Sequence, residues 1–368
     1  MANEKKIRVG ITQGDTNGIG LEVVLKVIAV PEFMEICTPV IYGSSKVLTY
    51  HRKAIDMPSF QVYHAADAEH IKDNMPNIIE VNGGEEVKVE LGTASKLAGQ
   101  AAYQALEMAV ADVKQGLIDV LVTAPINKDS IQSDEFHFPG QTEYLQASAG
   151  DDSKALMILC SENLRVALVT THLPLAQLPQ AITTGGIRQR LREFNDSLRR
   201  DFGIERPRIA VLSLNPHAGE NGLLGSEEQQ VIRPAIDQAY DEDRIVCFGP
   251  YAADGFFGNR QYRNFDGVLA MYHDQGLAPF KALAMDSGVN FTAGLPFVRT
   301  SPDHGTGYDI AGKGVAREDS MRQAIYMAID IWRNRQRYDE AGANPLRKQY
   351  HDKGKDNVVL DLTKETEE

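Results

Sequence analysis

Short, continuous runs of apolar residues constrain the fold of this chain more than any other feature. They end in small or polar turns, and they occupy residues 7–11, 120–122, 166–171, 209–214 and 268–272. Strands buried on both faces are continuous in this way, whereas strands with one solvated face alternate between apolar and polar residues. We therefore predict a sheet of mainly parallel strands.

Segments with helical periodicity lie between these runs. Small and apolar residues recur on one helical face from Ser95 to Lys114, and Gly116 then supplies a helix stop. The residues on that face are Ala98, Ala101, Ala102, Ala105, Ala109 and Val113, and a second such stripe consists of Met321, Ile325, Ala328 and Trp332. Both stripes are typical of ordinary core. Strands that alternate with helices predict an α/β fold.

The length and charge of the chain narrow its functional class. Its 368 residues, 43% of them hydrophobic, suffice for about two domains of ordinary size. Lysine and arginine total 38 and aspartate and glutamate total 51, so the formal net charge is -13. Because an acidic surface repels phosphate backbones, nucleic-acid binding is a poor hypothesis, although a few local cations suffice to bind a small anion.

The cysteines and the N-terminal segment indicate the compartment. Cys37, Cys160 and Cys247 are far apart and form no CxxC pair, which favours free thiols over disulfides. The polar segment 1–6 has no signal-peptide core, and no uncharged apolar stretch reaches the length of a membrane span. We expect a soluble, cytoplasmic protein with no membrane partner.

Histidines follow three of the strand-like runs. His172 follows the run 166–171, His217 lies just beyond 209–214, and His273 comes directly after 268–272. Ligands of open α/β sheets bind outside the carboxyl ends of the strands, and imidazole is a common ligand of divalent metals. Three protein ligands and one open position are typical of a catalytic metal site. A structural role for each histidine is the alternative, and the spacing itself matches no short zinc motif.

Cationic and polar residues cluster after His273. Lys281, Asn290 and Arg299 follow it closely, and arginine binds phosphate or carboxylate oxygens in a bidentate manner. This cluster favours a pocket for a small anion, with solvated surface charge as the alternative. Upstream, Gln141 and Thr142 would add amide and hydroxyl groups, or would simply begin a helix.

Two glycine-rich stretches remain. The first, residues 14–20, follows the first strand but does not read G-x-G-x-x-G, so the usual dinucleotide-binding fingerprint is absent. The second, residues 304–314, would let the backbone approach a flat or phosphate-bearing ligand closely. A turn-rich loop without a ligand is the alternative.

Seven motifs stand in one order between Gly14 and Gly314. They read GDTNGIGLE, TAPINK, FPGQTEYL, TTHLPL, NPHAGE, YHDQGLAPFK and SPDHGTGYDIAGKG. This set closely resembles the 4-hydroxythreonine-4-phosphate dehydrogenase family, within the isocitrate and isopropylmalate dehydrogenase superfamily. The resemblance implies a two-domain isopropylmalate dehydrogenase-like α/β fold, with mainly parallel sheets and a cleft between the lobes. It implies a cofactor-side domain of residues 1–130 plus 290–368, and a metal, substrate and dimerisation domain of residues 131–289.

The resemblance also implies roles for individual residues. One divalent metal (zinc, magnesium or cobalt) would be bound by the three histidines, with His273 supplied by the partner in a homodimer whose active site lies at the interface. The cofactor would be NAD or NADP. The implied substrate contacts are Gln141, Thr142, Lys281, Asn290 and Arg299, and the implied cofactor contacts are His304, Gly305, Thr306, Asp309 and Lys313.

The implied reaction oxidises the C3 hydroxyl of 4-phosphooxy-L-threonine in vitamin B6 biosynthesis. The metal would polarise the oxygen, and Lys281 would hold the phosphate together with Arg299. Asp254 and Asp274 are candidates for the group that removes the hydroxyl proton, each with the alternative of orienting a ligand histidine.

One departure from the family pattern bears on the substrate. The family usually reads GHTE where this chain has Gln141, and glutamine cannot take up a proton. The alternatives are a dehydrogenase of D-threonate or D-erythronate 4-phosphate, a phosphate acyltransferase of similar architecture, and a non-catalytic binding protein. An acyltransferase would not need the three histidines.

Overall fold

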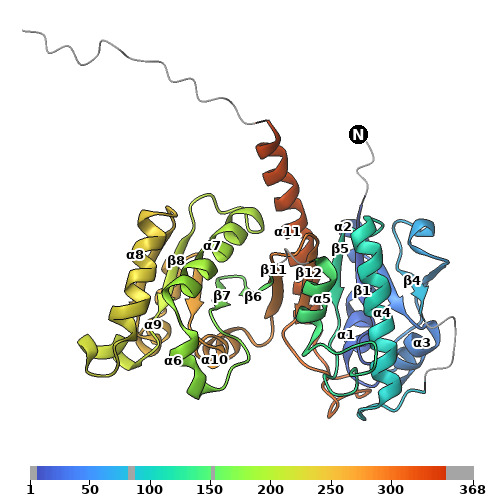
Figure 1. The fold of residues 1–368 in the computed structure, drawn as a ribbon. Coiled ribbons are helices and arrows are strands. Elements are labelled where there is room, and N and C mark those ends of the chain that lie inside the picture. The colour runs from blue at the N-terminus through green and yellow to red at the C-terminus, as the bar shows by residue number, and fades with distance from the viewer. Residues whose placement is uncertain (1–5, 82–87, 151–153, 345–368) are drawn as a thin grey trace, which may run out of the picture.

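The described strands form one sheet in the order β3-β4-β2-β1-β5-β12-β11-β6-β7-β10-β8-β9. The computed structural model describes residues 6–81, 88–150 and 154–344. Figure 1 shows the sheet with helices around it: α7 and α8 lie on one side of α11, and α3 and α4 on the other. The predicted mainly parallel α/β fold is confirmed, and each of the five apolar runs contributes to a strand.

The bounds of the strands are as follows. They are β1 (Ile7–Thr12), β2 (Cys37–Gly43), β3 (Tyr63–Ala65), β4 (Asn77–Glu80), β5 (Val120–Thr123), β6 (Leu156–Ser161), β7 (Leu164–Leu168), β8 (Arg208–Leu212), β9 (Val246–Tyr251), β10 (Gly267–Ala270), β11 (Val289–Ala293) and β12 (Val298–Pro302).

The direction of the strands reverses in the middle of the sheet. The strands from β3 to β12 in the sheet order are mutually parallel, and so are those from β7 to β9. Between them, β11 is antiparallel to β12 and to β6, and β6 is antiparallel to β7. The two parallel halves of the sheet therefore run in opposite directions.

Helices cover both faces of the sheet. They are α1 (Gly20–Ile28), α2 (Phe33–Ile36), α3 (Ser45–Ala54), α4 (Lys96–Gln115), α5 (Gln141–Ala149), α6 (Leu178–Ala181), α7 (Thr184–Arg200), α8 (Arg233–Asp241), α9 (Ala253–Gly258), α10 (His273–Ala284) and α11 (Asp319–Ala343). Strand β5 illustrates the two faces: Val120 and Val122 belong to the core cluster that includes α1 and α11, whereas Leu121 belongs to the cluster with α4. Burial on both faces explains why the runs are continuously apolar.

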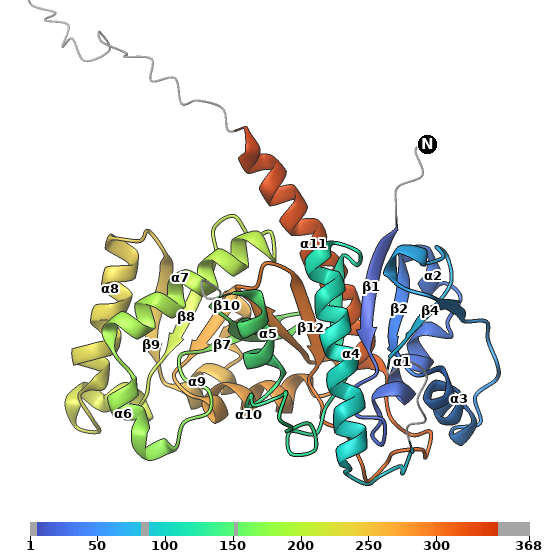
Figure 2. The same cartoon turned by 45° about the vertical axis from the view of Figure 1, so that its right-hand side comes forward.

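The two helices expected from their periodicity are present. In α4, the Ser95 hydroxyl accepts a hydrogen bond from the Ala98 N–H, and Gly116 ends the helix with a φ of 73°. A left-handed residue after the last turn suits glycine because it has no Cβ. Helix α11 packs on β5, β11 and β12 and then projects beyond the body of the molecule (Figure 2).

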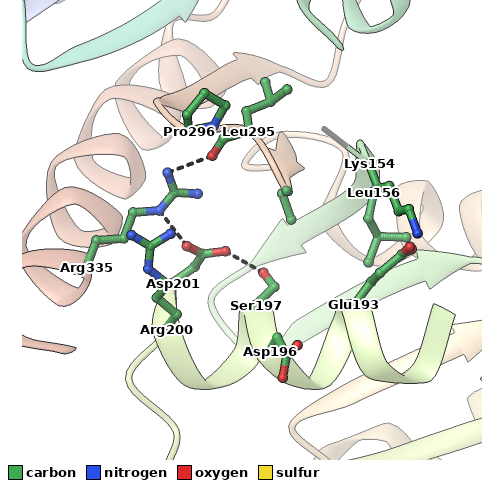
Figure 3. Close-up of a pocket in the computed structure, with 12 residues that line it drawn as sticks. Lys154, Leu156, Glu193, Asp196, Ser197, Arg200, Asp201, Leu295, Pro296 and Arg335 are labelled. Carbon is green, nitrogen blue, oxygen red and sulfur yellow. Dashed lines mark hydrogen bonds and ion pairs between the residues drawn. The ribbon is translucent and has the colours of Figure 1, made fainter. Parts of the chain in front are cut away.

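A buried ion pair joins α11 to the residue that follows the end of α7. Arg335 of α11 donates from Nε to the Asp201 carboxylate at 2.7 Å and from Nη1 to the Leu295 carbonyl at 3.1 Å. Asp201, which follows α7, also accepts from the Ser197 hydroxyl at 2.7 Å. Figure 3 shows these groups at the wall of a cavity of about 410 Å³. The pair ties the C-terminal helix to α7 and to the turn between β11 and β12.

Further expectations concern cysteines, membranes and domains. The three cysteines are free and buried, as expected, and burial raises the pKa of each thiol to about 12. None of the helices in the described part of the chain is long and apolar enough to span a bilayer.

The division into two domains stays a prediction, because one sheet runs through both halves. Residues 1–5 and 345–368 of the first predicted domain lie outside the described residues.

We predict that Asp201→Ala lowers the free energy of unfolding by about 3–5 kcal/mol, because it leaves the buried guanidinium of Arg335 without its carboxylate. The matched control is Asp339→Ala, which removes an ion pair to Arg200 whose side chains are 40% and 53% exposed. It should cost less than about 1 kcal/mol. Urea unfolding measures both values, and equal losses would contradict the structural role of the buried pair.

Candidate active site

A cavity of about 340 Å³ lies where the two halves of the sheet meet. Its wall includes Arg299 from β12, Asn290 from β11, Gln141 and Thr142 from the first turn of α5, and His172 from the segment after β7. The structure therefore brings together four of the five predicted substrate contacts. Lys281, the fifth, is not part of the described lining.

Arg299 carries a buried charge into this cavity. Its side chain donates from Nε and Nη2 to the Thr123 hydroxyl at 3.1 and 2.7 Å, and from Nη1 to the Thr292 hydroxyl at 3.0 Å. Nη2 also donates to Oε1 of Gln141 at 3.0 Å. None of these partners is charged, and no carboxylate of the described residues lies within 4.0 Å of the guanidinium.

The electrostatics of Arg299 favour an anionic ligand. Only 3% of the residue is exposed, and burial lowers the pKa of its guanidinium to about 10. The group still carries its charge at neutral pH. Glu143, which lines the same cavity, acts on this charge only at longer range, whereas a bound phosphate or carboxylate would compensate it by direct contact.

Further polar groups line the cavity. The Oδ1 atom of Asn290 is buried without a hydrogen-bond partner among the described residues, so it is available to accept one from a ligand. Lys128, which follows β5, and Arg190 of α7 add two cationic side chains, of which Arg190 also pairs with Glu193 at 2.7 Å. Neither residue was predicted from the sequence, although Lys128 ends the TAPINK motif. An orphaned acceptor and several cations suit a ligand that carries both anionic groups and hydrogen-bond donors.

His172, which lines this cavity, lies beside His273. They follow β7 and β10, which are adjacent and parallel, so the carboxyl ends of these strands meet. The ring centroids are 6.0 Å apart. Nδ1 of His172 is 3.9 Å from Oε1 of Glu143, and Nδ1 of His273 is 2.6 Å from Oδ1 of Asp274. Burial, followed by the charge of Lys128, lowers the pKa of His172 and favours the neutral ring that binds metals.

His217 lies in a different cavity, of about 510 Å³, which Asp254 and Asp274 also line. It begins a left-handed segment in which His217, Ala218 and Glu220 have φ values of 52°, 51° and 41°. Among the described residues, no group of three or more histidine, cysteine, aspartate or glutamate side chains has the arrangement of a metal site. Two of the three predicted ligands are therefore close together in one chain, and the metal itself stays a prediction.

Lys281 pairs with Asp303 instead of facing the Arg299 cavity. Its Nζ lies 3.3 Å from Oδ1 of Asp303, and burial raises the pKa of that carboxyl in spite of the opposing charge of Lys281. The Oδ2 atom of Asp303 and the Nε2 atom of the adjacent His304 are buried without hydrogen-bond partners in the described chain. These orphaned atoms are suited to a polar ligand.

The loop that holds the predicted cofactor contacts packs on the glycine-rich turn after β1. The Ile19 N–H donates to the carbonyl of Thr306 at 2.8 Å, and the Tyr308 hydroxyl donates to Asp15 at 2.7 Å. A Cβ at Gly18 would lie 2.7 Å from the Thr306 oxygen, so this contact requires glycine. Gly305, Asp309 and Lys313 belong to the same loop, which contains no helix or strand. The two glycine-rich stretches are far apart in the sequence, but they are in contact in the fold.

We predict that inorganic phosphate raises the melting temperature of the protein and that Arg299→Met lowers the affinity for phosphate by about 10- to 100-fold, because charged hydrogen bonds are lost. Arg333→Met, at a side chain of α11 that is 48% exposed, should bind phosphate as wild type does. Thermal shift titration measures both. Undiminished phosphate binding by Arg299→Met would contradict an anion site at this residue.

Comparison with known proteins identifies the family. The model of the family described as Pyridoxal phosphate biosynthetic protein PdxA matches residues 35–328. A relative from Bacteroides thetaiotaomicron, named 4-hydroxythreonine-4-phosphate dehydrogenase, is 57% identical over 361 residues, which cover 98% of each chain. The crystal structure of 4-hydroxythreonine-4-phosphate dehydrogenase from Klebsiella pneumoniae has a TM-score of 0.77 and 33% identity, and the match covers 90% of this chain and 99% of that one.

A relative from Oceanobacillus iheyensis carries the provisional name D-threonate 4-phosphate dehydrogenase. It is 39% identical to this chain, and the match covers 89% of this chain and 98% of the relative. The family model and the relatives cover most of the chain, in agreement with the resemblance carried by its seven motifs. The chain belongs to the PdxA family of pyridoxal phosphate biosynthetic proteins.

Proposed function

We propose that this chain is an NAD(P)-dependent dehydrogenase that oxidises the C3 hydroxyl of 4-phosphooxy-L-threonine in pyridoxal phosphate biosynthesis. The observation that carries this proposal is the buried guanidinium of Arg299, which contacts no carboxylate of the described residues, in a cavity that His172 also lines. The names of the family and of the relative from Bacteroides thetaiotaomicron support the same activity.

One molecule of NAD(P)+ per turnover accepts the two electrons that the proposed reaction releases. NAD(P)+ supplies the acceptor for the hydride from C3, and the hydroxyl proton is released as the alcohol becomes a ketone. The product is a β-keto acid, which loses carbon dioxide and takes up a proton to give 3-amino-2-oxopropyl phosphate. The His304–Lys313 loop would hold the cofactor, and the unpartnered Nε2 of His304 suits a polar ligand there.

The residues of the chain bind the end of the substrate that does not react. Arg299 would bind the phosphoryl oxygens, and Thr142 and Asn290 would add a hydroxyl and an amide at the same wall. Contacts to both the phosphoryl group and the carboxylate would limit the rotation of the substrate, so that its C3 carbon is presented to the histidines in one orientation. Lys128 and Arg190 would attract the second anionic group of the substrate, its carboxylate.

His172 and His273 would hold one divalent metal, with His217 of a second copy as the third ligand. Zinc, magnesium and cobalt are the candidates, and the metal would supply Lewis-acid stabilisation of the developing alkoxide. The side-by-side rings of His172 and His273 favour this division of ligands over the sequence-based expectation that His273 is the partner's contribution. His217 is exposed on the surface of its own chain.

In this proposal Asp274 orients a ligand histidine, and Asp254 is the candidate for the base that removes the hydroxyl proton. The 2.6 Å contact from Asp274 to Nδ1 of His273 favours a role in orienting that ring. Asp254 lines the cavity of His217 and is the remaining candidate for the base. Lys281 of α10, paired with Asp303, would approach the substrate from the side next to the predicted cofactor loop.

Exposed apolar side chains support a homodimer with the active site at its interface. They lie on the half of the sheet that carries the histidines, and they are Leu173, Leu175, Leu223, Leu224 and Phe248, which are 41%, 69%, 77%, 40% and 43% exposed. Phe248 belongs to β9, an edge strand of the sheet. Exposed apolar side chains are available for burial at an interface between two copies of the chain. In this proposal residues 131–289 form the dimerisation domain, and residues 1–130 with 290–368 form the cofactor domain.

We predict NADH or NADPH formation from 4-phosphooxy-L-threonine in the presence of zinc, magnesium or cobalt, and its loss when a chelator removes the metal. The comparison substrates are D-threonate and D-erythronate 4-phosphate, which lack the amino group. Absorbance at the nicotinamide band measures turnover with each substrate.

The outcomes separate the candidate functions. Faster turnover of D-threonate or D-erythronate 4-phosphate would replace the proposed substrate, and the provisional name of the relative from Oceanobacillus iheyensis makes that the second candidate. Acetyl transfer from acetyl phosphate to coenzyme A without nicotinamide reduction would indicate an acyltransferase. No turnover of any of the three phosphorylated acids would contradict a dehydrogenase and leave a binding protein.

Mixed dimers test how the histidines are shared. His172→Ala and His217→Ala proteins, each inactive, should regain activity when mixed, because one site of the mixed dimer then contains three intact histidines. His172→Ala mixed with His273→Ala is the matched control and should stay inactive. Recovery in the control mixture alone would instead assign His273 to the partner.

A further inference from the structure

The amide of Gln141 is held at both of its ends. Its Nε2 donates to the carbonyl of Ala124 at 3.1 Å, and its Oε1 accepts from Nη2 of Arg299 at 3.0 Å. The side chain is buried, with 9% of the residue exposed. These two neighbours determine which way the amide faces, because the reversed amide would place its NH2 against the guanidinium and its oxygen against a carbonyl.

All the groups that hold Arg299 are neutral. Two of its partners are the hydroxyls of Thr123 and Thr292, and the third is Gln141. Neutral acceptors position a guanidinium without cancelling its charge. A carboxylate in the place of Gln141 would instead form an ion pair and compete with any ligand anion.

A second buried arginine in the same chain provides the contrast. Arg335 is 6% exposed, and its charge is met by the carboxylate of Asp201 at 2.7 Å. Arg335 connects α11 to the end of α7 and to the turn between β11 and β12. Arg299 is equally buried but has no carboxylate partner in the described chain, although Glu143 of the same helix turn as Gln141 acts on it at longer range. The difference marks Arg299 as a binding group and Arg335 as a structural one.

We propose that Gln141 is the positioning residue of Arg299: it fixes the guanidinium in the cavity and leaves its charge available for the phosphoryl group of the substrate. The identity of that anion rests on the proposed function, whereas the positioning role does not. Gln141 thus acts through Arg299 and takes no part in proton transfer, in contrast to a histidine at this position. The glutamine is then compatible with oxidation of a phosphorylated hydroxy acid.

Inorganic phosphate is the probe for this proposal, because its binding requires no turnover. Gln141→Glu places a carboxylate against Arg299 and should lower the phosphate affinity by at least about 100-fold. Gln141→Met keeps the volume of the side chain but removes the acceptor, and should lower the affinity by about tenfold. The charge-matched control is Gln100→Glu, at an exposed position of α4, which should bind phosphate as wild type does. Calorimetric titration of the full-length proteins measures each dissociation constant.

Turnover of 4-phosphooxy-L-threonine adds a second measurement. Gln141→Met should raise KM about tenfold with kcat changed far less, since the substrate's phosphoryl group is bound more weakly while C3 still meets the same catalytic groups. A residue with only a structural role would lower the melting temperature of the free protein and leave the phosphate affinity unchanged.

The results distinguish this proposal from the proposed function. Wild-type affinity for phosphate in Gln141→Glu or in Gln141→Met overturns the positioning role. If Gln141→Glu does not fold, Gln141→Met decides alone. Weakened phosphate binding in the variants, together with no turnover of phosphorylated acids by wild type, supports the positioning role and contradicts the dehydrogenase.

Discussion

The antiparallel strand β11 is the element on which the arrangement of the described chain depends. It pairs with β12 on one side and with β6 on the other, and together with β6, which pairs with β7, it joins two parallel half-sheets of opposite direction into one sheet. It also contributes Thr292, which holds Arg299, and Asn290, which lines the cavity. The same pairing that makes the sheet continuous therefore places the anion-binding groups between its halves.

The two buried arginines, Arg335 and Arg299, differ in whether a carboxylate neutralises them, and this difference distinguishes a structural role from a binding role. Asp201 neutralises the buried guanidinium of Arg335, and the pair holds α11 against α7. Arg299 is held only by hydroxyl and amide oxygens, so its charge is free to act on a ligand. Keeping an unneutralised cation in the interior costs stability, and a phosphorylated substrate would compensate that cost when it binds. Because the net charge of the chain is -13, Arg299 is a local positive charge on an otherwise acidic protein.

Much of the fold could be predicted from the sequence, because strands buried on both faces must be continuously apolar. The strand-end positions of His172 and His273 could also be predicted, but their adjacency within one chain differs from the expectation that the partner subunit supplies His273. Strand β11 escaped this reasoning because its functional residues, Asn290 and Thr292, interrupt the apolar pattern. The place of His217 depends on a left-handed backbone segment, and the role of Gln141 depends on a partner 158 residues away. Neither is encoded in local periodicity.

The central claim is that Arg299 recognises the phosphoryl group of the substrate. A double-mutant cycle tests it most directly: calorimetry compares 4-phosphooxy-L-threonine with 4-hydroxy-L-threonine, on wild type and on Arg299→Met. We predict that removal of the phosphoryl group weakens binding to wild type by at least about 2 kcal/mol and binding to the variant by far less, because the two groups interact directly. Equal losses in both proteins would mean that the phosphoryl group binds elsewhere and would contradict the claim.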